Sequence, residues 1–256
     1  MIVARLQGGL GNCCFELAAA IGYATTHGIE WGWTGDASPH FLRLFPDLAE
    51  RRMAGRAVLR WVEPAFPYHP LPASLRSHDS VLLGYFQSWR YFAEPAQEAA
   101  VRAAFRLPGW VLQRIGSVSP VGIHVRRGDY RSKPDCHPVL PWEYYAHARQ
   151  ALGDHSGDGK YHVVSDDIGW CREWMPYAST YGSGDPADDF LSLAACRRIL
   201  CANSTFSWWA AWLGRAERVT LPSPWFGPAL PHDTRDLLPP GWQWVAWTPK
   251  PAKEPA

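Results

Sequence analysis

The run VGIHVRRGDY at residues 121–130 begins as an apolar strand and ends in a charged turn. Side chains alternate across a strand, so its valines and isoleucine would share one face while His124 and Arg126 share the other. These two polar side chains would stand at the carboxyl end of the strand, where open α/β sheets bind ligands. The run therefore predicts an α/β sheet with a ligand site at the end of this strand.

Two adjacent arginines give that site its chemistry. Arg126 and Arg127 each offer a planar fork of donors that suits phosphate oxygens, which a lysine cannot offer. Gly128 allows a sharp turn, and Asp129 can hold an arginine in place. The alternative interpretation is a solvated surface turn. The strand that precedes the arginines favours an anion site instead, and a diphosphate fits two guanidiniums.

Strands alternate with helices on both sides of this run. The expected strands lie at residues 2–6, 29–33, 80–86, 121–125, 161–165, 199–202 and 219–221, and the expected helices at about 12–28, 94–105, 142–152, 168–175, 188–197 and 207–213. Residues 36–72 are interpreted as loops with one or two short helices. We expect a linker over residues 108–119 and a frayed tail beyond Trp247. The alternation implies parallel sheets covered by helices.

Composition excludes several classes of protein. The chain has 256 residues, 47% of them hydrophobic and 19% charged, and a formal net charge of +1. No broad positive field would draw it to nucleic acid or to an anionic membrane. It shows no secretory signal, no run long enough to span a membrane and no paired metal-binding spacing among its six cysteines. We expect a cytoplasmic protein with reduced thiols.

A second motif lies at residues 199–209, where a short apolar strand runs into hydroxyl side chains and then an aromatic helix. Ser204 or Thr205 is placed to cap that helix. The exposed N–H groups at a helix start form an anion site. A capped helix without a ligand explains the segment equally well.

Two acidic pairs have three interpretations. Asp166-Asp167 follows an expected strand, and Asp188-Asp189 opens an expected helix. A carboxylate in a nucleotide pocket can accept hydrogen bonds from guanine. Acidic residues also favour helix starts on their own account, and a pair can bind a metal. The sequence leaves these alternatives open.

The segment GGLGN at residues 8–12 resembles part of a dinucleotide-binding fingerprint. The fingerprint is incomplete, because its third glycine position is occupied by Cys14. We interpret the glycines as a place where a strand, a helix and a ligand approach closely.

Together these motifs resemble the α-1,2-fucosyltransferases of glycosyltransferase family 11. The most specific segments are HVRRGDY at residues 124–130 and NSTFSWW at residues 203–209. GGLGN at 8–12, GYFQS at 84–88 and SDD at 165–167 add to them. The motifs occur in the family's order over nearly the whole chain.

The resemblance implies an α/β protein of the GT-B type, with two Rossmann-like domains facing each other across a cleft. Residues 1–117 would form the acceptor side, and residues 118–256 would bind GDP-fucose. The implied activity is that of an inverting galactoside α-1,2-fucosyltransferase, which moves L-fucose from GDP-β-L-fucose to a terminal galactoside. The acceptor would be a galactose-containing oligosaccharide or glycolipid, and no cofactor or metal would be required.

The resemblance also implies roles for individual residues. His124 would contact the nucleoside, Arg126 and Arg127 the pyrophosphate, and Asp189 the guanine. The remaining donor-binding residues would be Ser204, Thr205, Phe206 and Ser207, and the acceptor side would be lined by Gly9, Gly11 and Asn12. Arg126 and Asn12 would be the catalytic residues. The general base stays open, with Glu16 and Asp129 as the acidic residues nearest the motifs.

One departure from the family leaves alternatives standing. The family's Gln-Met-Phe-Gln-Tyr after GGLGN is replaced here by CCFEL at residues 13–17, on the expected acceptor side. A GT-B transferase with another nucleotide sugar, or a glycan-binding protein without catalysis, is compatible with this change. An NAD-dependent oxidoreductase, based on Gly9, Gly11 and Glu30, would leave the two adjacent arginines without a role.

Overall fold

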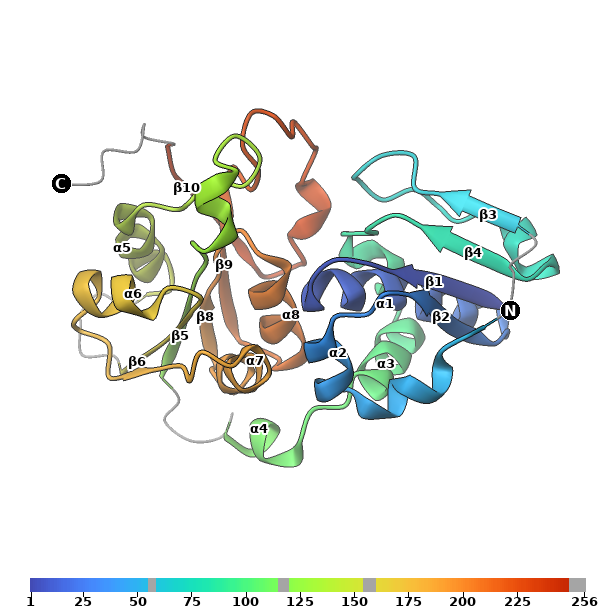
Figure 1. The fold of residues 1–256 in the computed structure, drawn as a ribbon, viewed down its shortest axis with the longest axis horizontal. Coiled ribbons are helices and arrows are strands. Elements are labelled where there is room, and N and C mark those ends of the chain that lie inside the picture. The colour runs from blue at the N-terminus through green and yellow to red at the C-terminus, as the bar shows by residue number, and fades with distance from the viewer. Residues whose placement is uncertain (55–58, 115–119, 154–159, 249–256) are drawn as a thin grey trace. The chain divides into compact units, whose positions relative to one another are not determined.

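The computed structural model describes residues 1–54, 59–114, 120–153 and 160–248. The chain divides into two compact units, which are described separately here (Figure 1). The first unit contains Met1–Leu107 and Asp233–Pro239, and the second contains Pro108–His232 and the stretch from Pro240. The expected domain boundary between residues 117 and 118 lies outside the described residues, as does the expected tail beyond Trp247 except for Thr248.

The first unit contains a four-stranded parallel sheet in the order β2-β1-β4-β3. Its strands are β1 (Ile2–Leu6), β2 (Trp31–Gly35), β3 (Leu59–Val62) and β4 (Ser80–Leu83). The sequence predicted β1 correctly, whereas β2 lies two residues later than expected. The interpretation of residues 36–72 as free of strands was wrong. β3 is a short edge strand with no fully buried side chain, so it lacks a clear apolar pattern.

Helix α1 (Leu10–His27) packs against this sheet because its sequence is rich in small residues. A Cβ on Gly22 would lie 2.1 Å from the backbone oxygen of Tyr91, so only glycine allows that approach. Gly28 ends the helix in the left-handed conformation, as predicted. The other helices of this unit are α2 (Pro39–Leu44), α3 (Pro95–Ala104) and the 3₁₀ helices η1 (Pro46–Arg51), η2 (Ala73–Ser77) and η3 (Trp89–Phe92).

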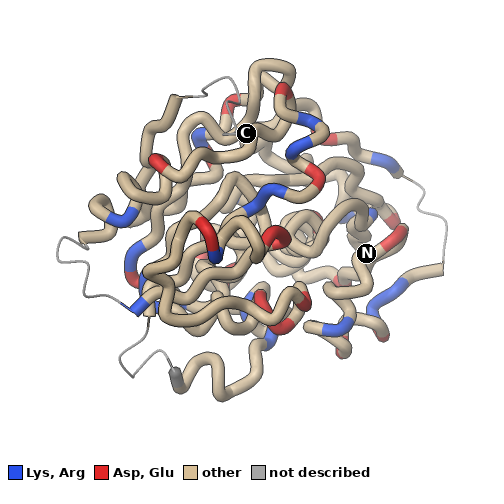
Figure 2. Tube along the Cα trace, turned by 60° about the vertical axis from the view of Figure 1, so that its left-hand side comes forward, with Lys and Arg blue, Asp and Glu red and all other residues tan. Residues whose placement is uncertain are grey.

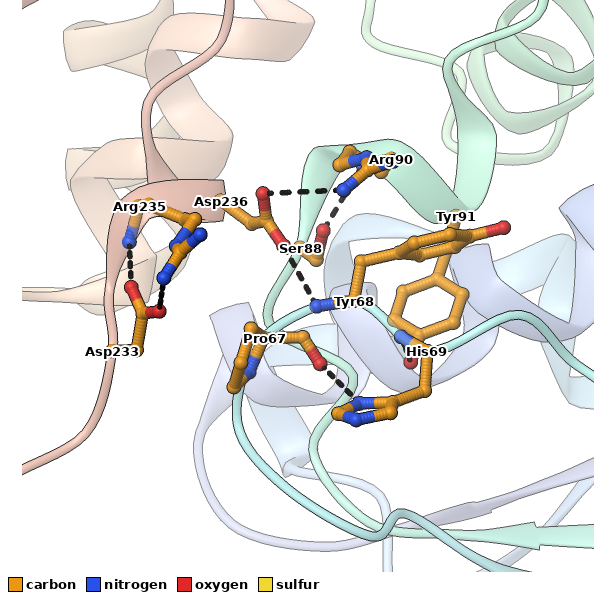
Figure 3. A network of polar contacts seen from close by, with 9 residues as sticks. All are labelled: Pro67, Tyr68, His69, Ser88, Arg90, Tyr91, Asp233, Arg235 and Asp236. Atoms are coloured by element: carbon orange, nitrogen blue, oxygen red, sulfur yellow. Dashed lines mark hydrogen bonds and ion pairs between the residues drawn. The ribbon is translucent and has the colours of Figure 1, made fainter.

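A late segment of the chain, containing the 3₁₀ helix η5 (Arg235–Leu237), completes the first unit. The backbone N–H of Tyr68 donates to Asp236 Oδ2 at 2.7 Å, and Asp236 Oδ1 lies 3.9 Å from an Arg90 nitrogen (Figure 3). The Arg90 guanidinium in turn lies 4.6 Å from the centroid of the Tyr68 ring. These contacts join residues far apart in the sequence, which no local pattern predicts.

The second unit contains a six-stranded parallel sheet in the order β10-β9-β8-β5-β6-β7. Its strands are β5 (Val121–Val125), β6 (Tyr161–Ser165), β7 (Thr180–Tyr181), β8 (Arg198–Leu200), β9 (Arg218–Ser223) and β10 (Gln243–Ala246). β5 and β6 have the predicted bounds, and β5 occupies an interior position. The outer strands β7 and β10 were not predicted. Part of the expected linker forms a helix, α4 (Gly109–Arg114).

Helices cover both faces of this sheet (Figure 1): they are α5 (Trp142–Ala151), α6 (Ile168–Trp174), α7 (Pro186–Ala194) and α8 (Thr205–Leu213). On one face, the valines and isoleucine of β5 pack in a buried cluster with Tyr144 and Tyr145 of α5. On the other face, a Cβ on Gly122 would lie 2.7 Å from Leu193 Cδ1 of α7. The predicted alternation of β5 is therefore confirmed. α7 begins two residues earlier than expected, because Asp185 caps it by accepting from the N–H groups of residues 187 and 188.

Charged residues of both signs are spread along the chain. Figure 2 shows lysine and arginine interspersed with aspartate and glutamate along the chain. Within the described ranges, no helix has the length and apolar character needed to cross a bilayer.

Candidate active site

A cavity lies at the carboxyl end of β5 in the second unit, where the sequence predicted a ligand site. It encloses about 390 Å³, including the space that opens to solvent. The lining comes from the ends of β5 and β6, the turn before α7, the first turn of α7 and the first turn of α8. It consists of His124, Arg126, Val164, Ser165, Asp166, Gly184, Pro186, Asp189 and Phe206. Of the predicted donor-side residues, the structure gathers His124, Arg126, Asp189 and Phe206 around this cavity.

Arg126 is oriented by two carboxylates. Its Nη2 lies 2.5 Å from Asp129 Oδ1, and its Nη1 lies 2.9 Å from Asp166 Oδ2. The ring of Tyr130 lies 5.4 Å from the guanidinium carbon. The side chain keeps 34% of its surface exposed. A guanidinium that is fixed in direction and still accessible is suited to an anionic ligand in the cavity.

Arg127 is not part of the cavity lining. Its side chain is buried, its Nε donates to Asp167 Oδ2 at 3.0 Å, and its guanidinium stacks 4.3 Å from the ring centroid of Trp170. Its backbone N–H donates to Asp166 Oδ1 at 2.9 Å. The two adjacent arginines thus have different environments, and contact of Arg127 with a diphosphate stays a prediction.

His124 is a neutral imidazole in the cavity wall. Burial, with a smaller effect of the nearby Arg126 charge, lowers its pKa to about 3. Its ring lies 5.0 Å from that of Phe206, and its buried Nδ1 has no hydrogen-bond partner in the described part of the chain. This uncharged nitrogen can therefore exchange one hydrogen bond with a bound ligand.

Asp189 lies in the cavity wall beside the turn before α7. It accepts hydrogen bonds from the Ser183 N–H at 2.7 Å, the Ser183 hydroxyl at 3.2 Å and the Gly184 N–H at 3.2 Å. Burial raises its pKa, although these hydrogen bonds oppose the shift. The carboxylate orders this turn, and its predicted recognition of guanine stays a prediction.

The other acidic residues have structural partners. Asp167 caps α6 by accepting from the Trp170 N–H at 3.2 Å, as the helix-start interpretation proposed. Asp166 binds both Arg126 and the backbone of Arg127. Across the four described ranges, no group of three or more His, Cys, Asp and Glu side chains gathers to hold a metal ion.

The start of α8 is capped as the sequence predicted. The Ser204 hydroxyl accepts from the Phe206 N–H at 3.4 Å. Ser207 is fully buried, and its hydroxyl donates to the Ser204 carbonyl at 3.2 Å. Thr205 is half-buried in the first turn of the helix. Of the four predicted donor-binding residues here, Phe206 is the one that lines the cavity.

The predicted acceptor-side residues belong to the first unit. Gly9 is the N-cap of α1, and Gly11 is buried in its first turn. Asn12 Oδ1 accepts from Gln87 Nε2 at 3.1 Å, which connects the GGLGN and GYFQS motifs.

Sequence reasoning missed Glu63, which accepts from the N–H groups of residues 85 and 86. The GYFQS motif was visible, but nothing in the sequence paired it with this glutamate.

Comparison with known proteins identifies the family. The family model described as Glycosyl transferase family 11 matches residues 71–245. The chain belongs to this family.

Several curated proteins resemble this family 11 chain. An alpha-1,2-colitosyltransferase of Escherichia coli is 28% identical, with 88% of this chain and 92% of that protein covered. The O-antigen biosynthesis glycosyltransferase WbnK of Escherichia coli is 32% identical over 43% of this chain. A galactoside 2-alpha-L-fucosyltransferase SEC1 of Bos taurus is 30% identical over 55% of it. The matches span 40% of WbnK and 44% of SEC1, less than half of each protein.

Solved structures confirm the predicted fold class. NodZ alpha-1,6-fucosyltransferase, co-crystallized with GDP, aligns with a TM-score of 0.51 at 15% identity, covering 82% of this chain and 90% of NodZ. The ADP-heptose LPS heptosyltransferase II of E. coli aligns with a TM-score of 0.50 at 11% identity, covering 95% and 89%. Both are GT-B glycosyltransferases, and this family 11 chain likewise consists of two α/β units with parallel sheets.

Proposed function

We propose that the protein is an inverting galactoside α-1,2-fucosyltransferase that uses GDP-β-L-fucose. Family membership supports glycosyl transfer, and the single observation that carries the donor site is Arg126. Its guanidinium is held by two carboxylates in the wall of a cavity at the carboxyl end of β5. The second unit would bind the donor, and the first unit, with Asn12, would carry the acceptor side.

The reaction places negative charge on the departing GDP. As the bond from the anomeric carbon to the phosphate oxygen breaks, its electron pair moves to the diphosphate while the sugar becomes oxocarbenium-like. Arg126 would stabilise the diphosphate because its direction is already fixed before the charge develops. The neutral His124 would add a hydrogen bond without adding a second positive charge.

A second candidate donor carries colitose. The Escherichia coli relative that aligns with 88% of this chain is named an alpha-1,2-colitosyltransferase. The same cavity and the same arginine would serve either sugar, because they are proposed to hold the diphosphate.

The donor is tested by measuring GDP release and product formation from GDP-fucose and from GDP-colitose, with lactose as acceptor and a lactose-free control. We expect lactose-dependent release from GDP-fucose and a fucosylated product whose α-1,2 linkage is visible by NMR. Faster transfer from GDP-colitose than from GDP-fucose would mean that the natural donor is GDP-colitose. If neither sugar is transferred while calorimetry still detects GDP binding, the protein is a nucleotide-binding relative without this activity.

We expect transfer to proceed at full rate in excess EDTA. A metal ion that bridges the phosphates would otherwise supply the positive charge that we assign to Arg126. The rate is measured with and without the chelator after extensive dialysis. A loss in EDTA that Mg²⁺ or Mn²⁺ restores would contradict metal independence.

A further inference from the structure

Three buried oxygens of the first unit lack hydrogen-bond partners in the described part of the chain. They are Oε1 of Glu16, Oε1 of Glu63 and Oε1 of Gln87. Glu16 and Gln87 have only 1% and 7% of their surface exposed. A buried polar atom without a hydrogen-bond partner lowers the stability of the folded state by about 1–3 kcal/mol. Three such atoms in the same unit therefore need an explanation.

These residues lie at the carboxyl edge of the four-stranded sheet. Glu63 directly follows β3, and Gln87 follows β4, its parallel neighbour in the sheet. Glu16 and Asn12 are one turn apart on α1, so they share a face of the helix that follows β1. Asn12 binds Gln87 directly, and the charge of Glu63 is close enough to raise the pKa of Glu16. The amide and carboxyl groups therefore form one cluster where open α/β sheets bind ligands.

Glu63 is held by one of its two carboxylate oxygens. Its Oε2 accepts from the N–H groups of Tyr85 at 2.8 Å and Phe86 at 3.0 Å. A Cβ on Gly84 would lie 2.4 Å from the Glu63 Cβ, so the glycine of the GYFQS motif allows this approach. The other oxygen, Oε1, has no hydrogen-bond partner among the described residues. A carboxylate oxygen held in this way can accept a proton from a hydroxyl group that comes within hydrogen-bond reach.

Burial raises the pKa of both carboxyls. The pKa of Glu16 reaches about 9, so this carboxyl is neutral at pH 7. Its Oε2 accepts from the Gln7 N–H at 2.9 Å, which leaves the proton for Oε1. At Glu63 the hydrogen bonds from the N–H groups of residues 86 and 85 oppose the rise. Two nearby carboxyls disfavour double ionisation, and of the two it is Glu63 whose charged form is stabilised by two backbone N–H donors. Asp129, the other acidic candidate, is paired with Arg126 in the second unit.

We propose that Asn12, Gln87 and Glu63 form the subsite for the attacking sugar hydroxyl, and that Glu63 Oε1 takes its proton. The inference rests on the function proposed above. The acceptor oxygen forms a bond to the anomeric carbon as the bond from that carbon to the phosphate oxygen breaks. The electron pair of the broken bond leaves with GDP, and the hydroxyl proton passes to Glu63. Gln87 and Asn12 orient the acceptor through hydrogen bonds to its hydroxyl groups.

The test compares Glu63→Gln with Glu50→Gln, which removes an exposed carboxylate of the same unit. Glutamine keeps an oxygen for the N–H groups of residues 85 and 86 but cannot accept the proton. We expect Glu63→Gln to lower kcat by about 10²-fold or more. It should also abolish the fall of kcat on the acidic side of the pH profile, with the GDP affinity and the melting temperature unchanged. Glu50→Gln should behave as wild type.

A second variant separates acceptor binding from proton transfer. Gln87→Ala should raise the acceptor KM with a smaller effect on kcat, because Gln87 is proposed to orient the acceptor. A kcat close to wild type and an unchanged fall of kcat at acidic pH in Glu63→Gln would show that Glu63 is not the base. An unchanged acceptor KM in Gln87→Ala would contradict the proposed acceptor subsite.

The test of the acceptor subsite can be separated from the test of the proposed donor. If the wild type transfers a sugar other than fucose, the same variants are compared with that sugar, and their kcat and KM values decide the subsite proposal. If the wild type transfers no sugar, methyl β-galactoside is titrated against wild type and Gln87→Ala by NMR. Binding that Gln87→Ala loses supports the subsite, whereas no binding to the wild type overturns it.

Discussion

We expect Arg126→Ala to lower the rate of sugar transfer by about 10²- to 10³-fold or more, with the protein still folded. The guanidinium is one third exposed and pairs only with Asp129 and Asp166 among the described ion pairs, so its removal leaves the sheet and core of the second unit in place. The loss arises because the departing diphosphate would face the two carboxylates without the cation between them. We expect GDP affinity, measured by calorimetry, to fall together with kcat.

Arg126→Lys should fail almost as completely. A single ammonium cannot pair with Asp129 and Asp166 on two edges while presenting a flat fork of donors to a phosphate. Lys133→Ala is the matched control, since Lys133 is exposed on the following segment and does not line the cavity. The control should retain activity. Turnover close to wild type in either Arg126 variant would exclude this guanidinium from the mechanism.

We expect Glu16→Gln to make the free energy of unfolding less dependent on pH. The folded protein holds the Glu16 proton up to a pKa of about 9, whereas the usual glutamate value is 4.5. Between these values, unfolding releases this proton, so the stability contributed by the neutral carboxyl is complete below pH 4.5 and declines as the pH rises. The decline is about 1.4 kcal/mol per pH unit, or about 3 kcal/mol from pH 5.5 to pH 8. Glutamine stays neutral and still accepts from the Gln7 N–H.

The measurement is denaturant unfolding of both proteins at several pH values in that window. The difference in unfolding free energy between variant and wild type should grow steadily with pH in favour of Glu16→Gln. Glu50→Gln, on the exposed surface, should show no such trend. A constant difference across the window would mean that Glu16 is ionised in the folded protein.

The sequence predicted the elements whose patterns are local. β5 has an alternating apolar face and was found with accurate ends. α1 has a run of small residues ended by Gly28, so its C-terminal end was found, although it begins two residues earlier than expected. Short outer strands such as β3 and β10 were missed, because half-exposed strands of four residues carry little periodic signal. Their places depend on neighbours that are distant in the sequence.

The same distinction applies to the candidate site. His124 and Arg126 share a face of one strand, so sequence alternation placed them correctly beside the cavity. Arg127 was predicted to share the site of Arg126 because the two are adjacent in the sequence. Adjacent side chains of an extended chain point in opposite directions, and Arg127 instead contacts Asp167 and Trp170, away from the cavity lining. Glu63 could not be found, because its role depends on a contact with residues 85 and 86 across two parallel strands.

The segment Asp233–Pro239 has a practical consequence for work on the separate halves of this enzyme. Because Asp236 binds Tyr68 and lies near Arg90, the first unit is not encoded by one continuous stretch of the gene. A truncation after Leu107 would lack this segment and leave the Tyr68 N–H without its acceptor. A fragment that starts at Pro108 would carry it without its partners. Expression of either half alone would therefore require grafting or deleting this short insertion.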